Sequence, residues 1–211
     1  MTAHQWTMLV PVKGGTGAKS RLPERVRGTR RADLARALAH DTIAAICAAP
    51  SVGRVVVIAG GPDVADTLGA LASLVTVVEQ PEGARLNEAI AHAAKGVQGP
   101  TAVILGDVPA ARPEDIEAAL ADAAALTWAV VADADGTGTT MLAAFDGVLA
   151  PRFGPGSLAR HVAAGYSPLA VAPSLRADVD TDADLTSAVA LGVGSHTAAV
   201  LGLVPRGALA S

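Results

Sequence analysis

Cysteine, aromatic residues and lysine are all scarce in this chain of 211 residues. Cys47 is the one cysteine, which excludes an internal disulfide and a zinc site built from several thiolates. Aromatic residues make up 2% of the sequence, but 51% of it is hydrophobic. That hydrophobic content excludes a disordered chain, and a chain of this length can bury one full core.

Long apolar runs are also absent. No stretch of about 18 apolar residues is free of charges and of glycine or proline, so we expect no membrane-spanning segment. Residues 1–10 lack the basic and apolar regions of a signal peptide. We therefore expect a cytoplasmic protein without a membrane partner.

The chain has no excess of positive charge. Its formal net charge is -4 and its pI is about 5.7, whereas a nucleic-acid-binding surface requires a basic face. We therefore expect no nucleic-acid partner. Lysine occurs only at Lys13, Lys19 and Lys95, and the first two lie in one glycine-rich segment.

Hydrophobic patterning predicts an α/β fold. Short apolar runs, expected to be strands, alternate with stretches of helical periodicity, which indicates a mostly parallel sheet covered on both faces. The expected strands are 8–12, 54–59, 76–79, 101–105 and 128–132, and the expected helices are 31–49, 62–74, 86–97 and 113–126.

The pattern changes after residue 136. We expect strands at 140–145 and 168–172, a helix starting at Ser157 between them, and a last helix near Ala183. No linker divides the chain, so we expect a single domain over 1–202. Residues 203–207 resemble a protease-site linker of the kind added for expression, so we leave the tail 203–211 out of the argument.

The glycine-rich segment 13–22 directly follows the first expected strand. Ligands of open α/β sheets bind at the carboxyl ends of strands, and glycines there let backbone amides approach phosphate oxygens. The segment is not a P-loop, since Lys13 and Ala18 stand where that motif has glycine, and Ser20 breaks a Rossmann fingerprint. A basic surface loop remains the alternative. The candidate phosphate-binding residues are Lys13, Gly14, Gly15, Gly17, Lys19 and Arg21.

Three aspartates form a candidate cation site. Asp107 ends an apolar strand, and Asp178 and Asp180 are spaced i, i+2, so both face one side of an extended segment. Neighbouring carboxylates repel unless a cation lies between them. The alternative for Asp107 is an ordinary turn residue. Thr181 and Asp184 have the spacing of a helix capping box, so we interpret Asp184, like Asp182, as a helix-start residue.

A second anion site is expected near residue 157. Ser157 is a good N-cap, and the glycines before it leave the first helical amides open. Arg160 and His161 are expected in the first turn, where a cation opposes the helix dipole unless an anionic ligand is bound. The alternative is a capped surface helix. The upstream residues 136–140 offer hydroxyls and flexible backbone.

Together, residues 13–22, 106–109, 153–161 and 178–185 resemble the phosphoenolpyruvate/2-phospho-L-lactate guanylyltransferase family of coenzyme F-420 biosynthesis. The resemblance runs from about residue 8 to residue 194. It implies a three-layer nucleotidyltransferase-type, Rossmann-like fold with a mostly parallel central sheet. It also implies an enzyme that joins GTP to a small phosphorylated three-carbon acid and releases pyrophosphate.

Residue roles follow from the same resemblance. Asp107, Asp178 and Asp180 would hold two Mg²⁺ ions, and Thr139, Gly154 and Ser157 would bind the phospho-acid. Gly156 departs from the pattern, because some relatives carry aspartate there. An ionised phosphate is already a nucleophile, so no general base is required. The remaining expected roles are pyrophosphate binding by Lys13, Lys19 and Arg21, phosphate binding by Arg160 and His161, and base recognition by Gln80 and Asn87.

Several substrates and functions stay open. Phosphoenolpyruvate comes first, because the Arg- and Ala-rich composition suggests a high-GC actinobacterial source, where that acid is expected. The alternatives are 2-phospho-L-lactate, 3-phosphoglycerate, another nucleotidyltransferase such as a molybdenum-cofactor guanylyltransferase, or a P-loop-like binding module without turnover. A homodimer and a transient contact with the next pathway enzyme also stay open.

Overall fold

The structure is a computed structural model that describes residues 5–14, 29–146 and 148–204. Its strands are β1 (Trp6–Val12), β2 (Val52–Ala59), β3 (Thr76–Glu79), β4 (Thr101–Ile104), β5 (Trp128–Ala132), β6 (Thr139–Ala144) and β7 (Ser167–Pro168). Its helices are α1 (Thr29–Cys47), α2 (Val64–Leu68), α3 (Leu86–Ala94), α4 (Pro113–Ala123), α5 (Ser157–Ala163), α6 (Asp182–Leu191) and α7 (Ser195–Leu201). Two 3₁₀ helices, η1 (Gly69–Ser73) and η2 (Pro173–Leu175), complete the described elements.

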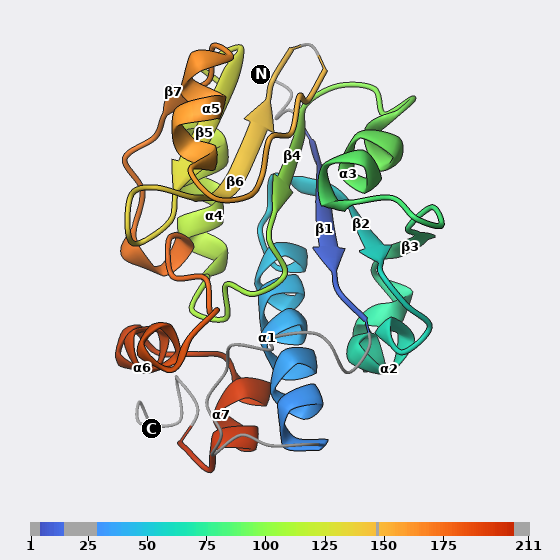
Figure 1. Cartoon of the computed structure of the whole chain (residues 1–211), viewed down its shortest axis with the longest axis vertical. Helices are drawn as coiled ribbons and strands as arrows, with labels where there is room; N and C mark the ends of the chain where they lie inside the picture. Colours follow the sequence, from blue (N-terminus) through green and yellow to red (C-terminus); the bar gives the residue numbers. More distant parts are fainter. Residues whose placement is uncertain (1–4, 15–28, 147, 205–211) are drawn as a thin grey trace.

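The described strands form one seven-stranded sheet in the order β3-β2-β1-β4-β6-β5-β7 (Figure 1). β1 pairs in parallel with β2 and β4, β2 with β3, and β5 with β7. β6 runs antiparallel to both of its neighbours, β4 and β5. The predicted mostly parallel sheet is therefore confirmed, and the antiparallel strand lies where the sequence pattern changes after residue 136.

Helices cover both faces of this sheet, as a three-layer fold requires. Side chains alternate across each strand, so Met8 and Val10 of β1 pack on one face and Leu9 on the other. The first face packs against α1, α2 and α4. The opposite face packs against α3, Leu149, Phe153 and Tyr166.

A third hydrophobic cluster lies beyond the sheet, where α6 and α7 pack beside α1 (Figure 1). It joins Leu34 and Leu38 of α1 to Leu185 of α6 and Ala198 of α7. It also contains residues next to the candidate cation site, namely Ala110, Ala177 and Val179. We call this group the third core.

Three sequence predictions differ from the structure. The expected helix 62–74 is split, because α2 ends at Gly69, whose φ of +48° suits glycine, and a 3₁₀ turn follows. The expected strand 168–172 is reduced to the two residues of β7. Helix α7 was not predicted at all. Over the described residues, no helix combines the length and apolar character needed to cross a bilayer.

Candidate functional site

The carboxyl ends of β1, β2 and β4 meet at one edge of the sheet, and glycines allow the close approach. The Gly60 amide donates to the Val12 carbonyl at 2.9 Å. A Cβ added at Gly106 would lie 2.9 Å from the Pro11 carbonyl oxygen, and one at Gly14 would lie 2.4 Å from Asp63 Oδ1. Larger residues would therefore push these loops apart.

This edge brings the start of the basic segment next to the loop that carries Asp107. Lys13 is exposed there. The other predicted triphosphate contacts, Gly15, Gly17, Lys19 and Arg21, lie outside the described residues, so their roles stay predictions.

Asp107 and the segment 178–180 lie side by side, as the sequence predicted for one site. The Val179 amide donates to the Asp107 carbonyl at 3.0 Å. Burial and then the charges of Asp107, Asp180 and Asp133 raise the pKa of Asp178 to about 7. A cation placed among these carboxylates would reverse that shift, and carboxylate oxygens are the ligands that Mg²⁺ prefers.

The neighbouring capping box was interpreted correctly. The Thr181 amide donates to Asp184 Oδ2 at 2.7 Å, and the Asp184 amide donates to Thr181 Oγ1 at 3.3 Å. The Asp180 amide also donates to Asp184 Oδ2, at 3.1 Å. Asp184 therefore fixes the backbone at Asp180, while the Asp180 side chain is exposed.

Sequence reasoning missed a fourth carboxylate, Asp133. It follows β5, just as Asp107 follows β4, and this shared position was the available signal. Its two oxygens accept from the Thr137 amide at 3.0 Å and the Gly138 amide at 2.8 Å. Arg176 donates to the Asp133 carbonyl at 2.7 Å and so holds this turn.

The predicted acid-binding residues Thr139, Ser157 and His161 form a buried network. Thr139 Oγ1 lies 3.0 Å from His161 Nδ1 and accepts from Ser157 Oγ at 3.1 Å. His161 Nε2 accepts from the Arg152 amide at 2.8 Å, so the network assigns the ring proton to Nδ1. Burial, followed by the charges of Arg160 and Arg152, lowers the pKa of His161 to about 4, so the ring is neutral near pH 7.

Two expectations for this region are wrong. The N-cap of α5 is Gly156, with φ of +68°, whereas Ser157 is the first helical residue and its hydroxyl bonds Thr139. Arg160 lies in the last turn of this short helix, where its charge does not oppose the dipole. Its guanidinium donates to the Arg152 carbonyl at 2.9 Å and to the Pro155 carbonyl. Arg160 therefore holds the conformation of the loop 152–156 through these carbonyls.

Asn87 and Gln80 both use their side chains on the protein. Asn87 donates to the Phe153 carbonyl at 3.1 Å and accepts from the Phe153 amide at 2.8 Å, which ties α3 to the loop 152–156. Gln80 donates to the Ala84 carbonyl. Their recognition of a base stays a prediction, as do the substrate contacts of Thr139, Gly154, Ser157, Arg160 and His161.

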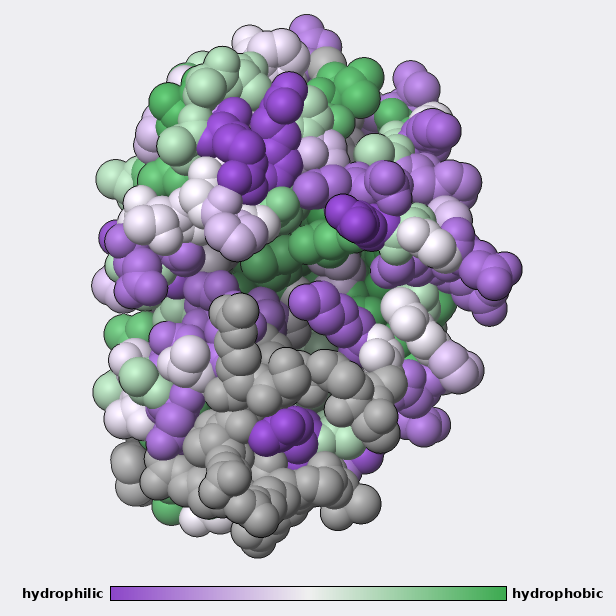
Figure 2. Space-filling view, in the orientation of Figure 1, coloured by the Kyte–Doolittle hydropathy of each residue, from purple (hydrophilic) through white to green (hydrophobic). Residues whose placement is uncertain are grey.

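The space-filling view shows this face hollowed near its middle (Figure 2). The floor of the hollow is hydrophobic, its rim is hydrophilic, and it lies over the carboxyl ends of β1 and β4 as drawn in Figure 1. The carboxyl ends of these two strands therefore border a concave surface.

A separate group, His40, Asp41 and His196, was not predicted. Within the described ranges, it is the one set of three or more His, Cys, Asp or Glu residues whose ligand atoms all lie within 4.8 Å. Its mixed nitrogen and oxygen donors would suit a transition metal rather than Mg²⁺. The two imidazole rings are stacked with centroids 3.5 Å apart, however, so at least one ring would have to rotate before both could bind one ion.

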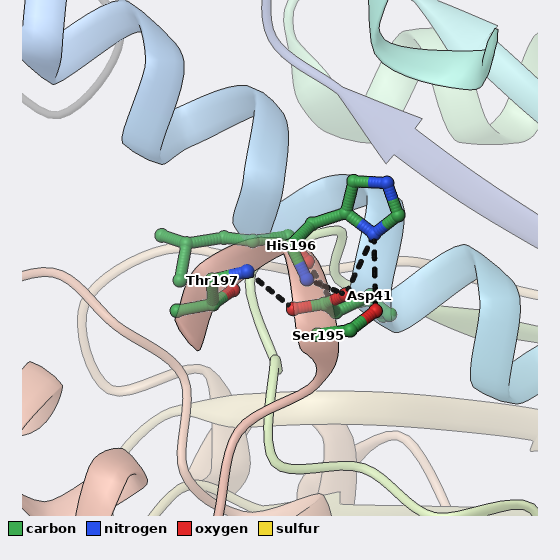
Figure 3. A network of polar contacts seen from close by, with 6 residues as sticks. Asp41, Ser195, His196 and Thr197 are labelled. Atoms are coloured by element: carbon green, nitrogen blue, oxygen red, sulfur yellow. Dashed lines mark hydrogen bonds and ion pairs between the residues drawn. The ribbon is translucent and has the colours of Figure 1, made fainter. Parts of the chain in front are cut away.

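The Asp41 carboxylate caps the start of helix α7 (Figure 3). Its carboxylate accepts from the His196 amide at 3.1 Å and from the Thr197 amide at 2.8 Å, the open amides at the start of α7. The pKa of the neighbouring His40 is lowered by burial and then by the charge of His196.

Comparison with known proteins gives one matching family over nearly the whole chain. Residues 6–203 match the family described as "Guanylyl transferase CofC like". The phosphoenolpyruvate guanylyltransferase of Streptomyces scabiei is 46% identical, with 92% of this chain and 95% of that protein covered. The enzyme of the same name from Geodermatophilus obscurus is 45% identical, with 98% of each chain covered.

Solved structures share the fold at lower identity. The 4-diphosphocytidyl-2C-methyl-D-erythritol synthase of Anaerococcus prevotii superposes with a TM-score of 0.61 at 11% identity, covering 89% of this chain and 96% of that one. Rv0371c of Mycobacterium tuberculosis, solved as a complex with manganese, gives a TM-score of 0.58 at 22% identity, covering 90% and 100%. The predicted nucleotidyltransferase-type fold is confirmed.

Proposed function

Because the chain belongs to the family of CofC-like guanylyl transferases, we propose that it transfers the guanylyl group of GTP to phosphoenolpyruvate. The products are enolpyruvoyl-diphospho-guanosine and pyrophosphate, and the reaction serves coenzyme F-420 biosynthesis. The observation that carries this proposal is the identity of 45–46% to two phosphoenolpyruvate guanylyltransferases over nearly the full length of both chains.

The proposed cation site is Asp107, Asp178 and Asp180. In its support, the three carboxylates come from two segments joined by the hydrogen bond from the Val179 amide to the Asp107 carbonyl. Burial, and then the charges of Asp107 and Asp180, raise the pKa of Asp178. All three offer oxygen donors, as Mg²⁺ requires. Two Mg²⁺ ions bound there would neutralise charge on the attacking and leaving oxygens of the transfer.

The chain's own residues then divide between the two substrates. Lys13, with Lys19 and Arg21, would hold the β- and γ-phosphates that leave as pyrophosphate, with Gly14, Gly15 and Gly17 giving the backbone room. The loop that Arg160 and Asn87 fix in place would bind the acid through Gly154, beside Thr139 and Ser157. The acid's ionised phosphate attacks the α-phosphorus, and no side chain has to remove a proton.

His161 has a positioning role in this proposal. Both ring nitrogens lie at hydrogen-bond distance from protein groups, Thr139 Oγ1 and the Arg152 amide. The neutral ring therefore orients the Thr139 hydroxyl and the start of the loop 152–156. In this proposal those neighbours contact the phosphate of the acid, and His161 acts on it through them. Gln80 and Asn87 stand at the proposed guanine side.

Pyrophosphate release tests the proposal directly. We expect release with GTP plus phosphoenolpyruvate, weaker or no release with 2-phospho-L-lactate or 3-phosphoglycerate, and a product of the mass of enolpyruvoyl-diphospho-guanosine. ATP and CTP serve as controls for the base. Release with none of the acids would indicate a binding module, and release only with CTP would indicate another nucleotidyltransferase.

Oligomeric state is tested separately. The sequence leaves a homodimer open, and light scattering of the purified chain would distinguish it from a monomer of 20.9 kDa.

A further inference from the structure

Three hydrogen bonds from distant parts of the chain hold the loop that carries Asp107. The Asp107 carbonyl accepts from the Val179 amide at 3.0 Å, and the Pro109 carbonyl accepts from the Gly194 amide at 3.1 Å. Between them, the Val108 amide donates to Thr42 Oγ1 at 3.1 Å. Thr42 supplies the one side-chain partner in this set.

Thr42 lies within helix α1, where its side chain makes this contact. It is fully buried, and so is Val108. The Thr42 hydroxyl donates its proton to the Leu38 carbonyl one turn earlier, at 2.9 Å, which leaves an oxygen lone pair for the Val108 amide. A buried amide without a partner is costly, so the loop follows the position of this hydroxyl.

The preceding residue of α1 fixes the other side of the same loop. Asp41 accepts from the first amides of α7 (Figure 3). A Cβ at Gly194 would lie 2.4 Å from Asp41 Cγ, so the segment before α7 fits tightly against Asp41. That segment places the Gly194 amide on the Pro109 carbonyl. One turn of α1 therefore sets Val108 directly and Pro109 through α7.

We infer that Thr42 is a positioning residue for Asp107, acting through Val108 to set where the Asp107 carboxylate meets Asp178. This inference rests on the proposed function, in which these carboxylates hold a divalent cation. Thr42 touches no substrate, so its loss should weaken cation binding and turnover and leave the binding of the acid nearly unchanged.

The test compares Thr42→Val with Thr42→Ser and with Thr101→Val. Valine keeps the volume and branching of threonine but removes the hydroxyl, whereas serine restores it. Thr101 is a matched control, because it is also buried, its hydroxyl donates to the Gly99 carbonyl at 3.1 Å, and it begins β4, the strand that Asp107 follows.

Cation affinity is measured in two ways. Electron paramagnetic resonance measures Mn²⁺ binding in the absence of substrate, and the activity assay gives the Mg²⁺ concentration for half-maximal pyrophosphate release. For Thr42→Val we expect both to weaken about tenfold, the fold-change of one lost buried hydrogen bond, with the KM for phosphoenolpyruvate within about twofold of the parent. Thr42→Ser should recover most of the affinity. Thr101→Val should lower the Tm and leave cation affinity unchanged.

Parent-like Mn²⁺ affinity in Thr42→Val, or equal losses in Thr42→Val and Thr101→Val, would overturn the inference. If Thr42→Val does not fold, Thr42→Cys answers the same question, because a thiol is a weak acceptor that still fills the space. Failure of the proposed function is a separate outcome: the parent protein would bind Mn²⁺ but release no pyrophosphate with any acid.

Discussion

Two titratable side chains in the site, the half-buried Asp178 and the fully buried His161, have pKa values shifted in opposite senses from their usual range. Asp178 is raised to about 7 by burial and neighbouring carboxylates, and His161 is lowered to about 4 by burial and neighbouring arginines. In both cases the surroundings disfavour the charged form of the side chain, and the pKa shift is the result. Asp178 is placed where a cation would relieve the penalty, whereas His161 is neutral and fully hydrogen-bonded, as a positioning residue requires.

Asp178→Asn should stabilise the protein and abolish its activity. The unfolded Asp178 carboxyl ionises near pH 3.8 and the folded one near 7, so its contribution to stability is lost as the pH rises through that interval. In metal-free buffer at pH 8, we expect Asp178→Asn to gain on the order of 2 kcal/mol in the free energy of unfolding, with little gain near pH 4. Pyrophosphate release should fall about a hundredfold or more.

The matched control is Asp122→Asn, an exposed substitution on α4 that should change neither quantity. Thermal unfolding with and without Mg²⁺ completes the test. Added Mg²⁺ should raise the Tm of the parent at pH 8 more than that of Asp178→Asn. An equal Mg²⁺ response in both proteins would remove Asp178 from the cation site.

His161 should make the protein sensitive to acid. Between pH 6.5 and about 4 the unfolded chain binds a proton that the folded ring does not, so the stability that His161 contributes is lost as the pH falls through this window. His161→Gln should have a lower Tm at pH 7.5, because hydrogen bonds are lost, but a shallower fall in Tm down to pH 4. The exposed helical residue His92, changed to Gln, provides the control slope.

At the scale of elements, apolar runs predicted most strands well, because β1, β2, β4, β5 and β6 are largely buried and need a hydrophobic sequence. The edge strand β3 is mostly exposed, and its β-branched residues gave the signal instead. Helix α7 was not predicted, because its first amides are capped by a residue distant in sequence and not by a side chain at its own start. The capping residue, Asp41, lies 155 residues before His196. Asp133 was missed for a similar reason: its amide partners lie in a local turn, but its proximity to Asp178 depends on how the sheet and residues 173–180 pack.

The turn between β5 and β6 gives an element-scale prediction. A Cβ at Gly138 would lie 2.2 Å from Asp133 Oδ2, so Gly138→Ala must displace that carboxylate, which accepts from the Gly138 amide. We expect the adjacent Thr139 to move with the turn. We expect kcat/KM for the acid to fall about tenfold or more, a loss of one positioned polar contact. Steady-state kinetics with varied phosphoenolpyruvate measures it.

Gly136→Ala separates displacement from backbone strain. Gly136 has φ of +72°, and an added Cβ there would have no neighbour within 4 Å, so alanine should cost about 1 kcal/mol of stability with kinetics close to the parent. Equal kinetic losses in both variants would show that turn strain, rather than the Asp133 position, limits activity.

At the scale of the whole molecule, the cation site lies where the edge of the sheet meets the third core. Val179 is fully buried in that core, while its neighbours Asp178 and Asp180 face the other way, as alternate residues of an extended segment do. Ala110, three residues after Asp107, packs in the same core. The spacing of the carboxylates should therefore depend on how well α1, α6 and α7 pack beneath them.

Paired cavity mutants test that dependence. Val193 in the third core and Val56 on β2 are similarly buried, at 4% and 2% exposure, so Val193→Ala and Val56→Ala should each cost about 1–3 kcal/mol and lower the Tm by several degrees. Only Val193→Ala should also raise the Mg²⁺ concentration for half-maximal activity, because only that cavity lies in the packing that supports Val179 and Ala110. If both variants shift the Mg²⁺ requirement equally, the site responds to global stability and the third core has no specific role in it.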